Sequence, residues 1–189
     1  MPGDNDHMLL AAARSGDHRS FERLVRNHQA RVFSLALRML GNRADAEDVL
    51  QETFIALYKN LDRFQERSKL STYLYRLAAN FSLMKLRQAK AGGARIEPLD
   101  AGAEIASTLP TPLERAEAAD LRKQLERSLM GLAAAERAVV VLRDVQGIDG
   151  REVARVLGIS LPAMKSRLHR GREALRRMML DRTDPEDSP

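Results

Sequence analysis

The side chains best suited to chemistry in this chain are the cations that gather near its C-terminus. Between Lys165 and Arg177 the sequence places six cations and one acid. Read as a helix, one face of this segment carries Lys165, Ser166, His169, Arg170 and Arg172. Arginine and lysine pair with guanine in the major groove, and serine or histidine adds smaller contacts. Three further arginines suit phosphates: Arg167, Arg176 and Arg177. The alternative is a solvated face, but solvated faces usually mix signs more evenly.

The residues before this segment predict a helix-turn-helix. Val153, Ala154 and Leu157 form the inner face of a short helix, and Gly158 supplies a turn in which a left-handed backbone costs nothing. Ser160 is a good N-cap for the helix that follows. The helix-turn-helix would place the cations where a recognition helix needs them, near its start. Its inner face repeats at helical spacing as Met164, Leu168, Leu175 and Met178.

A second candidate surface lies in residues 44–60, ADAEDVLQETFIALYKN. Five side chains of this helix can pack inward: Ala46, Val49, Leu50, Thr53 and Leu57. Another face carries Asp48, Gln51, Glu52, Phe54 and Tyr58. Exposed aromatic rings between acids indicate a protein-binding surface, and packing of Phe54 and Tyr58 in the core is an equally weighted alternative.

The helix expected over residues 69–90 has the composition of a single-strand binder. Its predicted core stripe is Leu70, Leu74, Leu77, Phe81 and Met84, and its other side carries Tyr73, Arg76, Asn80 and Arg87, with Lys69, Lys85 and Lys90 nearby. Cations track phosphates, rings stack on bases and an amide pairs with a base edge. For any one aromatic here, core packing is the competing interpretation.

Composition limits the range of functions. The 189 residues carry a net charge of +5, which favours an anionic partner. Without cysteine, the chain has no disulfide, thiolate zinc site or cysteine nucleophile. Its four histidines lack the companions that a metal site needs, so no metal and no cofactor is expected. No signal peptide and no apolar run of about 20 residues is seen, so a cytoplasmic protein without membrane insertion is expected.

Helical periodicity runs through almost the whole chain, and it predicts an all-α fold of two small helical domains joined by a flexible linker. We expect helices near 6–15, 18–41, 44–60, 69–90, 113–130, 134–146, 149–157 and 161–179. The predicted parts are a first domain at 1–90, a linker at 91–112, a second domain at 113–180 and an acidic tail at 181–189. The linker is rich in Gly and Pro, and it carries one arginine against three acids.

In this order, the parts resemble a bacterial sigma factor of the sigma-70 family, in its extracytoplasmic-function (ECF) group. FERLVRNHQARVFSLALRMLGNRADAEDVLQETFIALYKNLDRF is similar to the first part of region two, and LSTYLYRLAANFSLMKLRQ is similar to its promoter-melting and minus-ten-reading part. ERAVVVLRDVQGIDGREVARVLGISLPAMKSRLHRGREALR is similar to region four. The stretch KSRLHRGRE is close to the usual KSRLHRARE.

The resemblance implies a role for each candidate surface. The residues implied to dock on the clamp helices of the largest RNA polymerase subunit are Asp48, Gln51, Phe54 and Tyr58. Those implied to bind or melt the minus-ten element are Lys69, Tyr73, Arg76, Asn80 and Arg87, with Asn80 near the captured base. Those implied to bind the minus-thirty-five element are Arg143, Lys165, Ser166, Arg167, His169 and Arg170. The linker would run through basic channels of the polymerase.

The sequence departs from the family pattern at several positions. Tyr73 replaces the usual tryptophan of the W-L-Y-R-I segment, and it keeps a ring with a polar tip. Met84 replaces the usual acid after Asn80, which removes a local salt bridge or cap. P-A-M-K stands for G-T-V-K before the recognition residues, and Asp149-Gly150 stands for a commoner Ser-Tyr. Neither of these last two changes removes a DNA-facing cation.

The resemblance implies promoter DNA, the polymerase clamp, the flap of the second-largest subunit and an anti-sigma factor as partners. It also implies that catalysis belongs to the polymerase, and the sequence shows no nucleophile, metal cluster or phosphate loop for an enzyme. The main rival interpretation is a conventional helix-turn-helix regulator that binds duplex DNA without the polymerase. Two further interpretations are a recombinase-like enzyme and a sigma-like interaction protein that no longer melts DNA.

Overall fold

The computed structural model describes residues 2–64, 68–91 and 112–180, and within these ranges the regular elements are all helical. The first half contains α1 (Pro2–Arg14), α2 (His18–Leu40), α3 (Arg43–Lys59), the 3-10 turn η1 (Leu61–Arg63) and α4 (Leu70–Ala91). The second half contains α5 (Pro112–Gly131), α6 (Ala134–Val140), the π-helical turn η2 (Val141–Val145), α7 (Gly150–Leu157) and α8 (Leu161–Leu180). The predicted all-α class is confirmed. The predicted linker (except residue 91 and Pro112) and the acidic tail lie outside the described residues.

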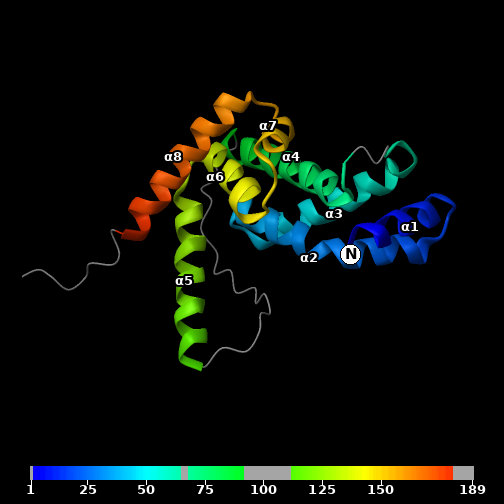
Figure 1. The fold of residues 1–189 in the computed structure, drawn as a ribbon, viewed down its shortest axis with the longest axis horizontal. Helices are drawn as coiled ribbons and strands as arrows, with labels where there is room; N and C mark the ends of the chain where they lie inside the picture. Colours follow the sequence, from blue (N-terminus) through cyan, green and yellow to red (C-terminus); the bar gives the residue numbers. More distant parts are fainter. Residues whose placement is uncertain (1, 65–67, 92–111, 181–189) are drawn as a thin grey trace, which may run out of the picture.

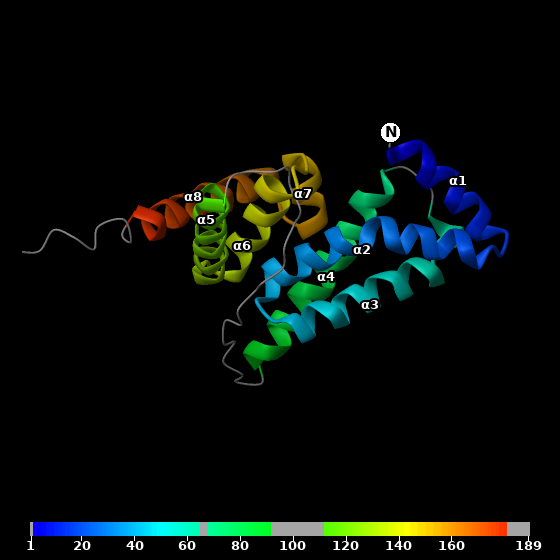
Figure 2. The same ribbon diagram turned by 90° about the horizontal axis from the view of Figure 1, so that it is seen from below.

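The helices form two bundles (Figure 1). Helices α1 to α4 lie together on one side of the molecule, and α5 to α8 lie on the other, as the view in Figure 2 shows. In the first bundle α2 packs against α1, α3 and α4, and in the second α8 packs against α5, α6 and α7. None of the described helices has both the length and the apolar character needed to cross a membrane.

Local sequence signals fix the ends of the long helices. The side chain of Asp17 caps α2 by accepting from the backbone N–H of Arg19 at 3.0 Å. Gly41 ends the same helix in the left-handed region, at φ +71°, and donates its N–H to the carbonyl of Leu37. Asn42 then caps α3 by accepting from the N–H of Asp45 at 3.2 Å. The helix boundaries expected near residues 18, 41 and 44 are therefore confirmed to within one residue.

The core of the first bundle corrects one sequence expectation. Most of the buried residues of α4 follow a row with a spacing of four, and Tyr75 and Ala79 are buried beside it. The row consists of Leu70, Leu74, Ala78, Ser82 and Leu86. The predicted stripe ended instead at Met84, whose side chain is 42% exposed. That stripe used a spacing of three and four in alternation. Helices that pack through their i, i+4 ridges bury the other row, which turns Met84 toward solvent.

The second bundle is built around the junction of α6 and η2, where residues 137–142 are all buried. The sequence predicted one continuous helix over residues 134–146, and the structure replaces its last turn with a π-helical segment. There the N–H of Gln146 donates to the carbonyl of Val141 at 2.9 Å. On α7 the structure buries Val153, Ala154 and Val156. Leu157, predicted to be on the inner face, is only partly buried against the core.

The two bundles contact each other, which the sequence did not predict. Helix α4 packs near α7, and α2 packs near α5. Met130 of α5 fills the space beside Gly41, where its sulfur lies 2.5 Å from the position a Cβ would take. Glu126 of α5 lies 4.0 Å from the guanidinium of Arg38. Buried residues of both bundles consequently form one continuous hydrophobic cluster.

Candidate functional site

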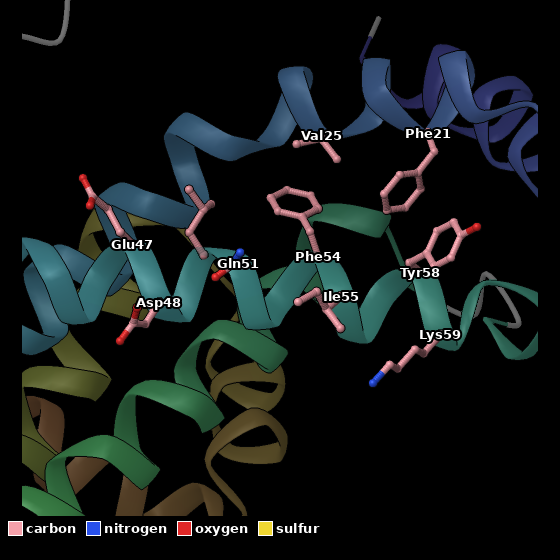
Figure 3. A pocket seen from close by; sticks show the side chains of 10 residues that line it. Phe21, Val25, Glu47, Asp48, Gln51, Phe54, Ile55, Tyr58 and Lys59 are labelled. Atoms are coloured by element: carbon pink, nitrogen blue, oxygen red, sulfur yellow. The ribbon is translucent and has the colours of Figure 1, made fainter.

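A hollow of about 680 Å³ opens along the line where α2 meets α3 (Figure 3). Its lining consists of Phe21, Val25, Glu47, Asp48, Leu50, Gln51, Phe54, Ile55, Tyr58 and Lys59. Acidic side chains stand at one end, and aromatic rings gather at the other. The Phe21 and Tyr58 rings meet edge to face, with centroids 5.1 Å apart. An apolar hollow with an acidic end suits a protein segment that presents apolar side chains and a cation.

The structure brings all four predicted docking residues to this hollow, in different ways. Asp48, Gln51 and Tyr58 are exposed, and 51% of the surface of Tyr58 is accessible to solvent. Phe54 is only 7% exposed, so its ring belongs to both the core and the wall of the hollow. Ile55, which the sequence reasoning missed, is 47% exposed in the same lining. Its spacing of four from Gln51 was the signal that could have identified it.

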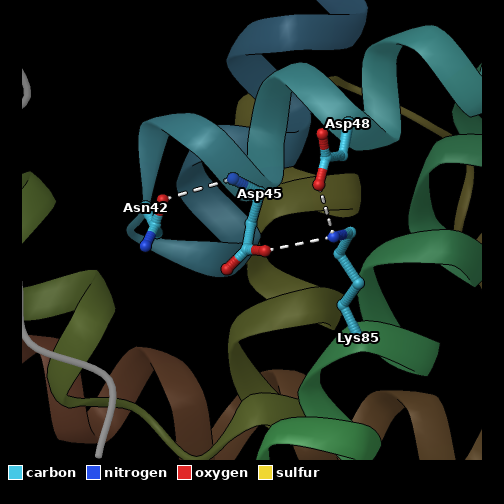
Figure 4. A network of polar contacts seen from close by, with 4 residues as sticks. All are labelled: Asn42, Asp45, Asp48 and Lys85. Carbon is cyan, nitrogen blue, oxygen red and sulfur yellow. Dashed lines mark hydrogen bonds and ion pairs between the residues drawn. The ribbon is translucent and has the colours of Figure 1, made fainter.

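A polar network joins the acidic end of the hollow to α4 (Figure 4). Nζ of Lys85 lies 2.9 Å from Oδ2 of Asp48 and 3.1 Å from Oδ1 of Asp45. The Lys85 side chain is 20% exposed, so much of its stem is covered. The hydrogen bond to Asp48 is the main cause that raises the pKa of Lys85 above its usual value. The cation is therefore held against α3 and turned away from the polar face of α4.

That polar face of α4 is a strip of exposed side chains. The predicted minus-ten residues lie within one narrow sector of the helix: Tyr73, Arg76, Asn80 and Arg87, with Lys69 just before its start. Arg76, Asn80 and Arg87 are exposed. Tyr73 is half-buried beside the Phe64 ring, at a centroid distance of 4.9 Å, and the Arg76 guanidinium lies 5.2 Å from the centroid of the Tyr73 ring. Cations, an amide and a ring on one accessible face are the groups that contact a single strand.

The helix-turn-helix is formed by α7 and α8. Asp149 caps α7 by accepting from the N–H of Arg151 at 2.8 Å, and these backbone bonds lower the pKa of its carboxyl group. Gly158 makes the turn at φ +63°. Ser160 then accepts from the N–H of Ala163 at 3.3 Å, and Met164 is buried beneath the new helix. The Gly158 turn and the Ser160 cap that the sequence predicted are in place, and the Asp149 cap is a further feature that was not predicted.

The exposed face of α8 holds the predicted DNA-contacting residues. Lys165, Ser166, His169 and Arg170 are exposed, and Arg167 is half-buried. Arg143 of η2 is half-buried and donates to the carbonyl of Ile148 at 3.1 Å.

Two arginines of α8 are paired with acids from the preceding elements. Nε of Arg170 donates to Oε1 of Glu136 at 2.9 Å, and its Nη1 donates to Oγ of Ser166 at 2.8 Å. Arg172 makes a two-point contact with Asp144, at 2.8 Å and 2.6 Å. These bonds raise the pKa of the Arg172 guanidinium. The acids come from α6 and η2, so the pairs tie α8 to the core of its bundle.

The described residues hold no cluster of three or more histidine, aspartate or glutamate side chains suited to a metal ion. His28 is buried between α1 and α2, where its Nε2 lies 2.8 Å from Oδ2 of Asp6. This contact joins two helices of the first bundle, so we interpret His28 as a structural residue.

Comparison with known proteins gives the same division of the chain. Residues 24–92 match the family description Sigma-70 region 2, and residues 122–175 match Sigma-70, region 4. The ECF RNA polymerase sigma factor SigW of Bacillus subtilis is 33% identical over 178 residues, which cover 91% of this chain and 95% of SigW. The RNA polymerase sigma factor CnrH of Cupriavidus metallidurans is 32% identical over 180 residues, which cover 92% of this chain and 94% of CnrH.

Solved structures agree with these matches. The structure of CnrH in complex with the cytosolic domain of CnrY superimposes with a TM-score of 0.65 at 28% identity, over 94% of this chain and 99% of that one. The sigma factor RpoE of Bartonella quintana, in complex with the anti-sigma factor NepR, gives a TM-score of 0.66 at 20% identity, over 85% of this chain and 97% of that one. The second likeness bears on the fold alone.

Proposed function

Because the chain belongs to the sigma-70 family of RNA polymerase sigma factors, in its ECF group, we propose how its surfaces divide the work of transcription initiation. Residues 1–90 act as region two and residues 113–180 as region four, with residues 91–112 as the connector that sets their spacing. The family decides against a conventional regulator that works without the polymerase. Catalysis stays with the polymerase, so this chain is not an enzyme, and it works where the polymerase does, in the cytoplasm.

The hollow between α2 and α3 is the docking site for the clamp helices of the largest polymerase subunit. Ile55 and Tyr58 supply exposed apolar surface, and Asp48 supplies an accessible carboxylate beside it. Such a patch has the apolar centre and polar rim of a specific protein interface. Gln51 lies between them and offers an amide for hydrogen bonds.

The strip on α4 captures the opened minus-ten strand, and this strip is the observation that carries the proposal. A factor that binds only duplex DNA has no use for an exposed Asn80 between Arg76 and Arg87, next to the ring of Tyr73. Base–aromatic stacking contributes about 1–3 kcal/mol per base, and it tolerates any base. The amide of Asn80 adds the hydrogen bonds that tell one base from another.

Helix α8 reads the minus-thirty-five element in the major groove. Lys165, His169 and Arg170 stand on its exposed N-terminal half, as the docking of a recognition helix requires. Arg143 and Arg167 are only half-exposed, so we assign them to phosphates at the edge of the contact. The flap of the second-largest subunit binds the same bundle.

Regulation by a protein partner is part of the proposal. CnrH, which this chain resembles over nearly its full length, was solved with the cytosolic domain of CnrY. We propose that an anti-sigma factor likewise covers the surfaces of this chain that bind polymerase and DNA. Without cysteine, the chain itself cannot sense thiol oxidation, so a redox signal would have to reach it through such a partner.

Transcription in a purified system tests the proposed function. Core bacterial RNA polymerase is mixed with the protein and a pool of genomic fragments, including the DNA upstream of its own gene, and transcript starts are sequenced. We expect starts that depend on the protein and share two boxes at a fixed spacing. Tight binding to duplex DNA without any protein-dependent start would contradict the proposal.

A further inference from the structure

The recognition helix carries two arginines that are already anchored before any DNA is bound. Arg170 and Arg172 leave α8 on its exposed side, with side chains 57% and 58% exposed. Each is nevertheless bonded to a carboxylate from outside the helix, Glu136 on α6 and Asp144 on η2. The side chains of these two acids are 20% and 31% exposed, so they are more covered than the arginines that they contact.

The atoms used by these bonds decide what each arginine can still offer. Arg170 spends Nε on Glu136 and one N–H of Nη1 on Ser166. Arg172 spends Nε and one N–H of Nη2 on Asp144. A guanidinium has five N–H donors, so each arginine keeps three, and its terminal edge carries one N–H from each Nη. Two parallel N–H groups on that edge are what a bidentate contact to O6 and N7 of guanine needs.

Close packing of the two helices makes the Arg170 contact possible. Gly171 is buried where α8 crosses α6, and a Cβ at this position would lie 2.7 Å from Cγ2 of Val140 and 3.5 Å from Cβ of Glu136. Because position 171 has no side chain, Glu136 can come close to α8 and reach Arg170, the residue before Gly171. Glu136 reaches Arg170 across 34 residues of chain because the backbones are this near.

We propose that Glu136 and Asp144 are specificity-determining positioning residues, which hold Arg170 and Arg172 so that only their terminal edges face the minus-thirty-five element. The inference rests on the proposed role of α8. A guanidinium that is already held through its Nε loses little side-chain entropy when its free N–H groups bind the acceptor atoms of a base. The same anchoring keeps the two cations from turning toward whatever phosphate is near, which lowers affinity for DNA of other sequence.

This inference predicts an unusual direction for the loss of an acid. Glu136→Gln and Asp144→Asn each remove a negative charge and weaken the hold on one arginine, because an amide oxygen accepts a weaker hydrogen bond than a carboxylate does. The affinity of the protein for non-promoter duplex should then rise by roughly 2- to 5-fold for each change, which corresponds to the free energy of one exposed ion pair. The plot of log affinity against log salt should become steeper by about 0.9 for each arginine that gains a phosphate. A purely structural role for the acids predicts weaker binding instead.

The experiment uses the holoenzyme and a promoter library. Wild type, Glu136→Gln, Asp144→Asn and the double variant are combined with core polymerase, and starts are counted on promoters randomised in the upstream box, with non-promoter duplex as competitor. Glu22→Gln is the matched control, because it removes the acid of an i, i+4 pair with Arg26 on α2, in the other bundle. Thermal unfolding of each variant is measured in parallel.

We expect the acid variants to initiate from the same start sites with a flatter preference at the upstream box, strongest in the double variant, and the control to match wild type. An unchanged preference, or an equal loss on every sequence, would overturn the inference. If wild type itself yields no protein-dependent starts, it is the proposed function that fails. If the double variant does not fold, the two single variants give the same reading.

Discussion

The ion pair between Lys85 and Asp48 joins the two proposed binding surfaces of the first bundle, the polar strip on α4 and the hollow between α2 and α3. The Lys85 ammonium lies 2.9 Å from Oδ2 of Asp48. Lys85 belongs to α4, the helix proposed to read the minus-ten strand, and Asp48 lines the proposed polymerase-docking hollow. Asp45 shares the same cation from one turn earlier on α3. A docking partner that brings its own cation to Asp48 must therefore compete with Lys85.

Replacing Lys85 with Met distinguishes its effect on stability from its effect on polymerase binding. Met keeps an apolar stem of similar length and removes the charge. The free energy of unfolding should fall by about 1 kcal/mol or less, since Asp45 and Asp48 are both well exposed. Polymerase binding should be unchanged or stronger, because Asp48 remains and loses its competitor. Pull-down with core polymerase at several salt concentrations measures this, and weaker binding would show that Lys85 is needed for docking.

The same variant makes a prediction about pH. Contacts with the two acids, above all the hydrogen bond to Asp48, raise the pKa of Lys85 above 10.5 in the folded protein. A raised pKa contributes stability below the unfolded value, and this contribution is lost as the pH rises through the folded value. Urea unfolding should therefore separate wild type from Lys85→Met at neutral pH, and the difference should shrink above about pH 10.5. A difference that stays constant across that range would exclude the ion pair as its source.

Asp48 and Gln51 are the cleanest test of the docking hollow. Both are exposed, so replacing them together with Ala should abolish binding to core polymerase and leave the unfolding transition almost unchanged. Phe54→Ala is the contrasting variant. Its ring is buried, and the loss should lower the free energy of unfolding by about 3–5 kcal/mol. Co-purification of the double variant with core polymerase would place the docking surface elsewhere.

Arg170→Ala tests base reading directly. If the terminal edge of Arg170 pairs with guanine, its loss should weaken promoter binding by roughly 1–3 kcal/mol and relax the preference at one position of the upstream box. Arg167→Ala, on the same helix but proposed to contact a phosphate, should weaken binding more uniformly. Binding measured on a set of single-base variants distinguishes the two. An equal loss on all of them for Arg170→Ala would assign it to the backbone.

The sequence predicted the helices well because their signals are local. Caps and turns at positions 17, 41, 158 and 160 are set by residues within one turn, and helices α2, α3 and α4 were placed to within a residue at each end. Periodicity also gave the exposed strip on α4. It could not say which faces of different helices meet, because that depends on packing between segments far apart in sequence.

The misses share this cause. Met84 was expected in the core because the sequence does not reveal the angle at which α4 crosses its neighbours. The pairs Glu136–Arg170 and Asp48–Lys85 join residues more than 30 positions apart, so a pattern of neighbouring residues cannot predict them. Contact between the bundles likewise depends on Met130 beside Gly41, a match of shapes and not of residue types.

Arg137 is a buried cation, and its removal should not harm the fold. It is 6% exposed, and burial lowers the pKa of its guanidinium. Its Nη1 donates to the sulfur of Met130 at 3.0 Å, and its Nε has no hydrogen-bond partner among the described residues. Apolar replacements of buried charges are often neutral or stabilising. Arg137→Met should leave the free energy of unfolding unchanged or raise it by about 1–2 kcal/mol.

Chemical denaturation of Arg137→Met checks this, with Arg155→Met as the control for an exposed arginine. Arg155 is paired on α7 with Glu152, its side chain is 67% exposed, and its loss should change stability by about 0.5 kcal/mol or less. If Arg137→Met unfolds more easily than wild type by over about 2 kcal/mol, the guanidinium must make stabilising contacts that outweigh its desolvation.

Gly171 and Val140 face each other where α6 packs against α8, and the effect of a change at one position should depend on the residue at the other. Alanine favours a helix over glycine by about 1 kcal/mol, so Gly171→Ala gains on propensity alone. Its Cβ would lie 2.7 Å from Cγ2 of Val140, however, and overpacking of a core typically costs about 1–3 kcal/mol. The single change should therefore be neutral or destabilising by up to about 2 kcal/mol.

In a Val140→Ala background the obstructing methyl group is gone, and Gly171→Ala should become stabilising by about 1 kcal/mol. Urea unfolding of the four proteins gives the coupling between the two sites as a double-mutant cycle. Gly171→Ala alone should also push α6 away from α8 and loosen the Glu136–Arg170 contact, so it should flatten the upstream-box preference as Glu136→Gln does. Equal effects of Gly171→Ala in both backgrounds would mean that the Val140 side chain gives way without moving the helices apart, and then neither the strain nor the change in preference should appear.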